Sequence, residues 1–222
     1  VLICAVERSG EVYIPGGNFE LAAGDVISFI APVRDGRKFL KKNGFQTHQA
    51  KSCIIVGGGR AAYYLAKRLI ELGISVQIVE NKKERCEELS VLLPQAIIVN
   101  GDGTSEELLN EIGITTTESL VPLTGIDEEN IMLTLYAKEV SNAKVVTKIN
   151  RITYTGVIDQ LDLGSVVYPK YITSEAIIAF VRSKTATMNN NIETMIHLFD
   201  DRVEAIEFVV GAQSPIVNVP LA

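Results

Sequence analysis

Short apolar stretches alternate with amphipathic helical patterns through the middle of the chain, and this alternation constrains the fold more than any other feature. Strands that alternate with helices predict right-handed β–α–β crossovers and therefore a parallel sheet. The stretches are continuously apolar, as expected when helices cover both faces of the sheet. We therefore predict an α/β fold with a doubly wound, Rossmann-like sheet of six parallel strands over residues 51–185. The predicted strands are 52–56, 75–80, 96–100, 119–123, 145–148 and 166–168. The predicted helices are 60–72, 83–93, 105–112, 128–140, 154–161 and 174–182.

Two shorter segments flank this predicted domain. Residues 1–42 form a β-rich segment, residues 43–50 a polar linker, and residues 186–222 a second β-rich segment. The first segment has no obvious first strand, and the second stops where another element is expected. We therefore predict that the two segments complement each other, within one chain or between chains. The elements predicted in them are strands at 2–6, 11–14 and 26–30, a helix at 34–40, and strands at 192–198 and 203–210 around a turn at 200–201.

The charge balance, the cysteines and the histidines narrow the class of protein. The chain has a formal net charge of -6 and no obvious basic stripe, which disfavours nucleic-acid binding. It has no run of about 18 apolar residues, the length that a membrane-spanning helix needs. The 3 cysteines and 2 histidines have no metal-binding or redox spacing. We therefore expect no metal site and a reduced, cytoplasmic compartment.

A glycine-rich turn joins the first predicted strand of the domain to its first helix. Gly57, Gly59 and Ala62 follow the spacing G-x-G-x-x-A that is typical of dinucleotide-binding turns. The first glycine permits a tight turn, the second lets a pyrophosphate approach the backbone, and the small third residue lets the helix pack closely on the strand. The N-terminus of the helix then offers free N–H groups and a partial positive charge to a phosphate.

Glu80 ends the second predicted strand, where an acidic side chain can accept hydrogen bonds from ribose hydroxyls. Because its carboxylate would repel a 2′-phosphate, NADP is disfavoured as a ligand. Together with the glycine-rich turn, Glu80 predicts a site for an adenine nucleotide. The glycines are also compatible with a tight turn beside an empty pocket, and this alternative stays open.

The loop after the third predicted strand is polar as well. Asp102 in this loop either binds the adenosine end of a nucleotide or holds the turn that precedes the next helix. Thr104 is the expected N-terminal cap of that helix. The sequence alone leaves both roles of Asp102 open.

Three further candidates lie at or just after the ends of the fourth and fifth strands. Thr124 lies beside the expected switch point of the sheet, where ligands of open α/β sheets bind. Asp127 is a candidate cap for the helix that follows. Lys148 ends the fifth strand and is expected to pair with a phosphate or, alternatively, with Glu128.

No catalytic group accompanies the predicted pocket. A dehydrogenase needs an acid or base beside the nicotinamide, yet His48 precedes the predicted domain and His197 follows it. No histidine–acid pair stands at a strand end, and no lysine stands in a phosphate-binding loop. We therefore expect ligand binding without turnover, and no enzymatic activity.

These motifs resemble the nucleotide-binding half of the RCK (also called KTN) domains. The resemblance rests on residues 56–65, on Glu80, on Gly-Asp-Gly-Thr at 101–104, and on residues 123–130, which end in Asp-Glu-Glu-Asn. Within that family the chain is most similar to the peripheral, cytoplasmic subunits of Trk-type potassium uptake systems.

The flanking segments extend the resemblance over nearly the whole chain. Residues 1–42 resemble the closing part of the family's small α+β C-terminal module, and residues 186–222 resemble its opening part. The order of the pieces implies a window from a longer tandem protein. Val1 in place of an initiator methionine agrees with that expectation.

The resemblance implies a non-catalytic regulatory subunit that binds NAD(H), or else ATP or ADP, and thereby gates potassium transport. Such a subunit would be a homo-oligomer, as a dimer or a ring, at the cytoplasmic face of a membrane-embedded potassium channel or transporter. It would not insert into the membrane and would not bind nucleic acid. The residues that the resemblance assigns to the nucleotide site are Gly57, Gly59, Arg60, Ala62, Glu80, Asp102, Thr104, Thr124 and Lys148.

Alternatives to this interpretation stay open. The glycine-rich turn alone would suit a nucleotide-dependent oxidoreductase. The domain would also fit a structural RCK domain whose nucleotide pocket is empty. The helix predicted at 174–182 is either a contact between subunits or a helix packed on its own sheet.

Overall fold

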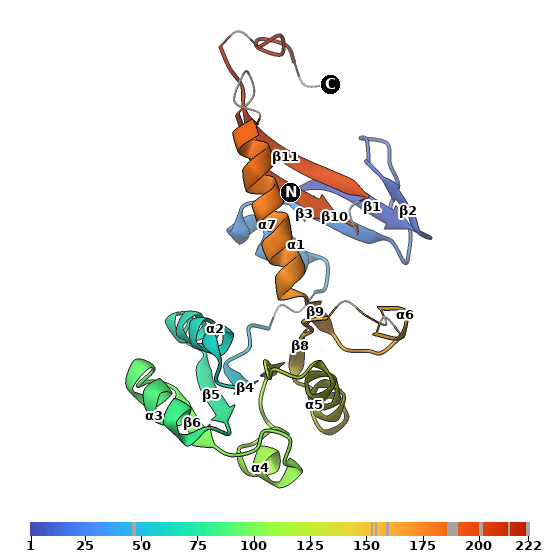
Figure 1. Cartoon of the computed structure of the whole chain (residues 1–222). Coiled ribbons are helices and arrows are strands. Elements are labelled where there is room, and N and C mark those ends of the chain that lie inside the picture. Colours follow the sequence, from blue (N-terminus) through green and yellow to red (C-terminus); the bar gives the residue numbers. More distant parts are fainter. Residues whose placement is uncertain are drawn as a thin grey trace. The chain divides into compact units, whose positions relative to one another are not determined.

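The computed structural model describes residues 1–45, 48–151, 153, 155–158, 160–185, 191–199, 202–212 and 214–220. The chain divides into two compact units (Figure 1). The larger unit is Gln49–Ile172, and the smaller unit combines Val1–His48 with Thr173–Ala222. The domain limits expected from the sequence, with residues 51–185 in one domain, stay a prediction.

One sheet organises the larger unit. Its strands are β4 (Ser52–Val56), β5 (Ser75–Glu80), β6 (Ile97–Asn100), β7 (Ser119–Pro122), β8 (Lys144–Lys148) and β9 (Ser165–Val167). They lie in the order β6-β5-β4-β7-β8-β9, and every neighbouring pair is parallel. The predicted Rossmann-like sheet of six parallel strands is therefore confirmed, and no predicted strand end is wrong by more than one residue.

Helices connect the successive strands of this sheet. The last of them was predicted at 154–161, but the structure shows a single helical turn there. Residues 154 and 159 lie outside the described residues. The connecting helices are α2 (Arg60–Glu71), α3 (Lys83–Leu92), α4 (Glu106–Glu111), α5 (Asp127–Val140) and α6 (Thr155–Ile158).

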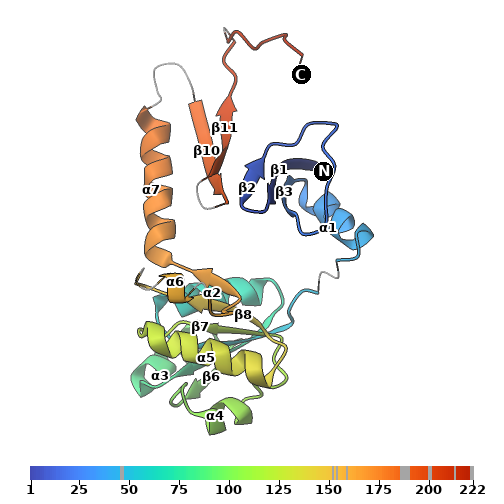
Figure 2. The same ribbon diagram turned by 90° about the vertical axis from the view of Figure 1, so that its right-hand side faces the viewer.

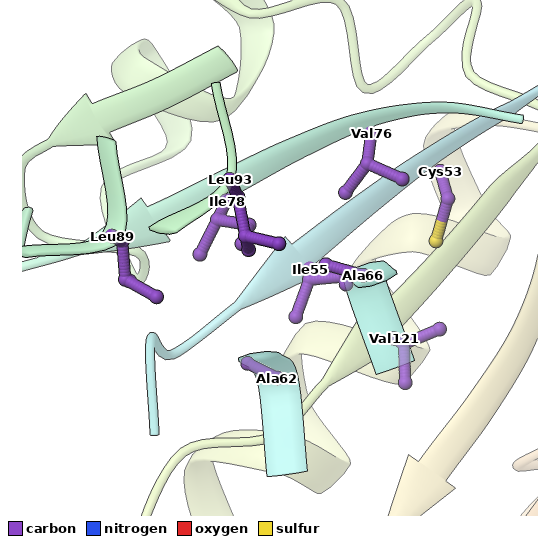
Figure 3. Packing of buried hydrophobic residues seen from close by; sticks show 9 residues of the cluster. All are labelled: Cys53, Ile55, Ala62, Ala66, Val76, Ile78, Leu89, Leu93 and Val121. Atoms are coloured by element: carbon purple, nitrogen blue, oxygen red, sulfur yellow. The ribbon is translucent and has the colours of Figure 1, made fainter. Parts of the chain in front are cut away.

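Hydrophobic clusters cover both faces of the sheet. Side chains alternate between the faces of a strand, so Cys53 and Ile55 of β4 belong to the cluster under α2 and α3 (Figure 3). Ile54 and Val56 belong to the cluster under α4 and α5. None of these four side chains is more than 2% exposed. The unbroken apolar sequence of β4 is thus explained by burial on both sides.

Strand β4 also marks the point where the strand order reverses. It pairs with β5 on one side and with β7 on the other. The chain therefore runs outward from β4 to β6 and then returns to begin the other half of the sheet at β7. In an open parallel sheet this arrangement leaves a crevice at the carboxyl ends of the strands.

The smaller unit contains two antiparallel sheets. Strands β1 (Leu2–Arg8), β2 (Glu11–Tyr13) and β3 (Val26–Ile30) form a sheet in the order β2-β1-β3. Strands β10 (Asn191–Leu198) and β11 (Val203–Val209) form a hairpin, whose predicted turn at 200–201 lies outside the described residues. Ser9 and Gly10 join β1 to β2 with positive φ angles of 53° and 84°, as a tight hairpin turn requires. Two helices complete the unit, α1 (Val33–Lys42) and α7 (Pro169–Thr185), of which α7 begins in the larger unit.

Arg202 links the two strand segments of the smaller unit. Its guanidinium donates hydrogen bonds to the carbonyl oxygen of Gly10 at 2.6 Å and to the carboxylate of Glu7 at 2.8 Å. Among the described residues, β10 and β11 pair only with each other and add no strand to the β2-β1-β3 sheet. Within this chain the two segments therefore meet through a side chain, and their pairing between chains stays a prediction.

The described part of the chain holds no helix that is both long and apolar enough to cross a bilayer. Nor do the described residues gather three histidine, cysteine or acidic side chains into a metal-binding group. The three cysteines are free thiols. Burial raises the pKa of the Cys53 thiol, which is an inert core residue rather than a nucleophile.

Packing of α3 on the sheet provides a test of this core. Leu89 is fully buried, whereas Val91 on the same helix is 80% exposed. We expect Leu89→Ala to lower the free energy of unfolding by about 2–5 kcal/mol, because it removes buried methyl groups and leaves a cavity. Val91→Ala should change it by less than about 0.5 kcal/mol. Urea unfolding of both variants measures the difference, and equal effects would contradict the described orientation of α3.

Candidate functional site

A cavity of about 670 Å³ lies at the carboxyl ends of the strands, on both sides of the switch point at β4. Its walls are the loops that follow β4 to β7 together with the end of β8. A volume of this size is within the range of small-molecule sites. The cavity brings together most of the predicted site residues, namely Gly57, Gly59, Glu80, Asp102, Thr104, Thr124 and Lys148.

Two predicted residues lie outside this cavity. Ala62 is fully buried in the core, where α2 packs on the sheet, which fits the packing role predicted for a small third residue. Arg60 begins α2 with an exposed side chain and does not line the cavity. Of the residues predicted to form the site, Ala62 therefore packs beneath the cavity and Arg60 lies beside it.

The glycine-rich turn is tight and leaves its backbone open to the cavity. Gly57 has a φ of +100° and donates from its N–H to the carbonyl oxygen of Val79 at 2.8 Å. A Cβ atom on Gly57 would lie 3.0 Å from the backbone of Leu123, so both strain and contact exclude a side chain. Gly59 has open space where its Cβ would be and directly precedes α2. A ligand can therefore approach the backbone at Gly59 without obstruction.

The peptide of Gly58 is held from both sides. Its N–H donates to Oε2 of Glu80 at 2.7 Å, and its carbonyl oxygen accepts from Nε of Arg85 at 2.7 Å. The other carboxylate oxygen of Glu80 accepts from the N–H of Lys82 at 2.8 Å. We call this arrangement, made by Gly58, Glu80 and Arg85, the Gly58 clamp. Glu80 lines the cavity with a carboxylate whose orientation is already fixed.

Arg85 was missed by the sequence analysis. It lies in the first turn of α3, far from the glycines in sequence, and no local motif marks it. Only the fold brings its guanidinium to Gly58, where it also lines the cavity. Arg85 also forms an ion pair with Glu88 at 2.6 Å, an exposed pair of the kind that contributes little stability.

Asp102 holds its own turn, as one of the two interpretations expected, and it also lines the cavity, while its binding of a nucleotide stays a prediction. Its Oδ1 accepts from the N–H of Thr104 at 2.9 Å and from the hydroxyl of Thr104 at 2.7 Å. The hydrogen bonds from the backbone and hydroxyl of Thr104 lower the pKa of Asp102. Thr104 is not the helix cap, since Ser105 caps α4 by accepting from the N–H of Leu108.

Gly103 belongs to the Gly-Asp-Gly-Thr motif, but the sequence did not predict its structural role. A Cβ atom built on it would lie 2.2 Å from Cγ1 of Val56, the last residue of β4. The loop after β6 therefore passes directly over the end of β4. The absence of a side chain at Gly103 is what allows Asp102 and Thr104 to reach the same cavity as Gly57.

A buried amide joins the ends of β7 and β8. Asn130 is fully buried and accepts from the N–H of Thr124 at 2.9 Å, while its amide group donates to the carbonyl oxygen of Lys148 at 3.0 Å. Lys148 in turn donates from Nζ to the carbonyl oxygen of Leu123 at 3.1 Å. Partial burial lowers the pKa of Lys148, and the nearby charge of Asp127 opposes this effect. A cation so placed would gain from an anionic ligand.

Asp127 does not cap α5, and this prediction is wrong. Its carboxylate instead accepts from the backbone N–H groups of Asn150 and Arg151, both at 2.9 Å, and from the side chain of Asn150. Glu128 pairs with Arg151 at 2.8 Å, so the alternative pairing of Glu128 with Lys148 is not observed. The two acidic residues hold the segment that follows β8.

The charges that line the cavity are balanced. Glu80, Asp102 and Glu129 provide three carboxylates, and three cations face them. A nucleotide, which combines anionic phosphates with ribose hydroxyls and a base, matches such a mixture better than a purely anionic ligand would. The cations are Lys82, Arg85 and Lys148.

Comparison with protein families gives a direct match. The family model described as the TrkA-N domain matches residues 53–169. A Trk system potassium uptake protein TrkA from Azorhizobium caulinodans is 28% identical over 221 residues, which are 99% of this chain and 47% of that protein. The protein of the same name from Haemophilus influenzae is 30% identical over 204 residues, with coverages of 92% and 44%. The chain spans about half the length of the curated relatives it matches.

Solved structures agree with the fold. The TrkA-N domain of the inner membrane protein ybaL from Escherichia coli has a TM-score of 0.54 at 15% identity and covers 61% of this chain and 99% of that one. The GsuK channel bound to NAD has a TM-score of 0.59 at 17% identity, with coverages of 88% and 35%. At these identities the likeness concerns the fold alone.

The pH dependence of stability tests the contacts of Asp127. Burial would raise the pKa of this carboxyl group, but hydrogen bonds from Asn150 and Arg151 and the charge of Arg151 lower it overall. A lowered pKa in the folded state contributes stability above the unfolded value of about 3.9, which is lost as the pH falls through the folded value. We expect Asp127→Asn to cost about 1–3 kcal/mol at neutral pH. It should also flatten the loss of stability below pH ~4 in thermal unfolding curves. An unchanged acid profile would contradict the described contacts.

Proposed function

Since the chain belongs to the TrkA-N domain family, we propose that it binds an adenine nucleotide without turnover, NAD(H) in the first place and ATP or ADP as alternatives. One observation carries the proposal. The glycine-rich turn, Glu80, Asp102 and Lys148 line a single cavity at the switch point of the sheet. This is the position at which open α/β sheets bind their ligands.

Each end of the cavity suits a different part of the ligand. The N-terminus of α2 and the open backbone at Gly59 would receive the phosphates, as helix N-termini do. Glu80 would accept from ribose hydroxyls, sharing oxygens that already carry backbone hydrogen bonds. Lys148 would provide a partly desolvated positive charge for an anionic group on the other side of the switch point.

The chain would act as a cytoplasmic regulatory subunit of a potassium uptake system. Its relatives are named as Trk system potassium uptake proteins, and a channel of similar fold is described as bound to NAD. Its partner would be a membrane-embedded potassium transporter or channel, with the chain peripheral to the inner face of the membrane and assembled as a homo-oligomer. Gating would follow if the nucleotide bound two states of the assembly with different affinity.

Calorimetric titration with NADH, NAD, ATP and ADP tests the binding proposal. We expect saturable binding of at least one of them, weakened about 10- to 100-fold by Lys148→Met, because a charge-assisted hydrogen bond is worth about 1.5–3 kcal/mol. Lys67→Met on the exposed face of α2 is the control and should bind as the unmodified chain does. No binding of any of the four at millimolar ligand would favour the empty pocket. Steady oxidation of NADH with carbonyl substrates, abolished by Glu80→Arg, would favour an oxidoreductase.

The Gly58 clamp gives a second test with a closely matched control. Arg85 and Arg68 each form an exposed pair with a glutamate three residues later, at 2.6 and 2.7 Å. Only Arg85 also holds the Gly58 carbonyl oxygen. We expect Arg85→Ala to weaken nucleotide binding about tenfold through loss of one charged hydrogen bond that orders the turn. Arg68→Ala should leave the affinity unchanged, and equal affinities of the two variants would contradict a role for the clamp.

A further inference from the structure

Helix α1 concentrates positive charge in a chain that is acidic overall. The formal net charge of the chain is -6, yet five of the 10 residues of α1 are basic and only Asp35 is acidic. The expectation that the chain lacks a basic stripe is therefore wrong for this helix. We call the five the basic stripe, and they are Arg34, Arg37, Lys38, Lys41 and Lys42.

The basic stripe occupies one side of α1. At 3.6 residues per turn its members fall within an arc of about 140°. The opposite side packs on the β2-β1-β3 sheet of the same unit (Figure 2), where the rings of Phe39 and Phe29 lie 5.1 Å apart. Gly36 on that side faces Phe29 and Ala31. These contacts fix the rotation of the helix, so the stripe faces solvent.

The stripe has no partner within the described part of the chain. All five side chains are exposed, and none of them makes an ion pair or side-chain hydrogen bond there. By contrast, Arg8 in the same unit binds Asp25 through two hydrogen bonds of 2.7 Å. Like charges four residues apart destabilise a helix, and the stripe contains such a pair in Arg37 and Lys41. Lys41 and Lys42 lie in the last turn of α1, where the helix dipole offsets part of this cost, and no ion pair within the described chain offsets the rest.

Exposed apolar side chains stand at both ends of the stripe. Val33 begins α1 with 75% of its surface exposed, and Phe45 follows the helix with 59% exposed. Although the apolar side of α1 is occupied by its own sheet, a cluster of lysines and arginines on a helix is a recognised signature of binding to anionic lipid headgroups.

We propose that α1 is a docking surface for an anionic lipid bilayer. The basic stripe would face the phosphate headgroups, while Val33 and Phe45 would reach the boundary with the acyl chains. A nucleic acid would contact the same cations but would gain nothing from these two apolar side chains, whereas the boundary of a bilayer would bury them. The contact would be reversible and salt-dependent, since exposed charges are screened by salt. It provides a physical contact for the peripheral location proposed above, but it rests on α1 alone.

Co-sedimentation of the full 222-residue chain with lipid vesicles tests this proposal. The vesicles are phosphatidylcholine alone or phosphatidylcholine mixed with phosphatidylglycerol. The stripe variant replaces Arg34, Arg37, Lys38 and Lys41 by Gln. The control variant replaces four exposed lysines outside α1 by Gln. Both variants therefore lose four positive charges, and they differ only in where on the chain these charges are removed. The control positions are Lys51, Lys67, Lys83 and Lys170. Circular dichroism checks that both variants keep their helix content.

The unmodified chain and the control variant should sediment with the anionic vesicles and not with the neutral ones. We expect the stripe variant to bind at least about tenfold more weakly, and binding should fall as salt is raised. Equal binding to both vesicle types, equal loss in both variants, or no sedimentation at all would overturn the proposal. So would preference for a DNA duplex, or self-association through α1 without lipid binding. The vesicle experiment contains no nucleotide, so a negative result would not contradict the proposed nucleotide binding. Conversely, a negative calorimetric titration would not contradict the proposed lipid binding.

Discussion

Burial of β4 on both faces is the constraint on which the larger unit depends. Its side chains enter two separate hydrophobic clusters, so helices must cover both sides of the sheet. Its backbone pairs in parallel with β5 and with β7, so the chain must cross over to reach each of them. The end of such a strand is the one place where loops from both halves of the sheet meet, and the cavity lies there.

The parts of this architecture that depend on local sequence could be predicted. The strand limits followed from short apolar runs, and the roles of Gly57 and Ala62 followed from their spacing. Glu80 was placed correctly at the cavity because the end of a strand fixes the position of its last residue. The position of Arg60 was not predictable from spacing, since the first residue of a helix can point toward the loop or away from it.

The parts that depend on contacts between distant segments could not be predicted. Arg85 reaches Gly58 only because α3 packs beside the turn, and Gly103 is required only because its loop crosses the end of β4. The Asp-Glu-Glu-Asn motif was recognised, but the tasks of Asp127 and Asn130 were not. Both are buried and join the ends of neighbouring strands to each other and to α5. These two side chains of the motif therefore hold the backbone that follows β7 and β8 in place.

The close approach of Gly103 to Val56 has a consequence for how sequences of this kind can diverge. A methyl group at position 103 and a branched side chain at position 56 compete for the same space, with only 2.2 Å between the atoms concerned. A side chain at position 103 therefore requires the side chain at position 56 to shift or to be replaced by a smaller one. The two positions lie in different β–α repeats, so the loop after β6 and the end of the central strand β4 are coupled. Covariation between positions 56 and 103 is therefore the mark that this crossing would leave in an alignment of related chains.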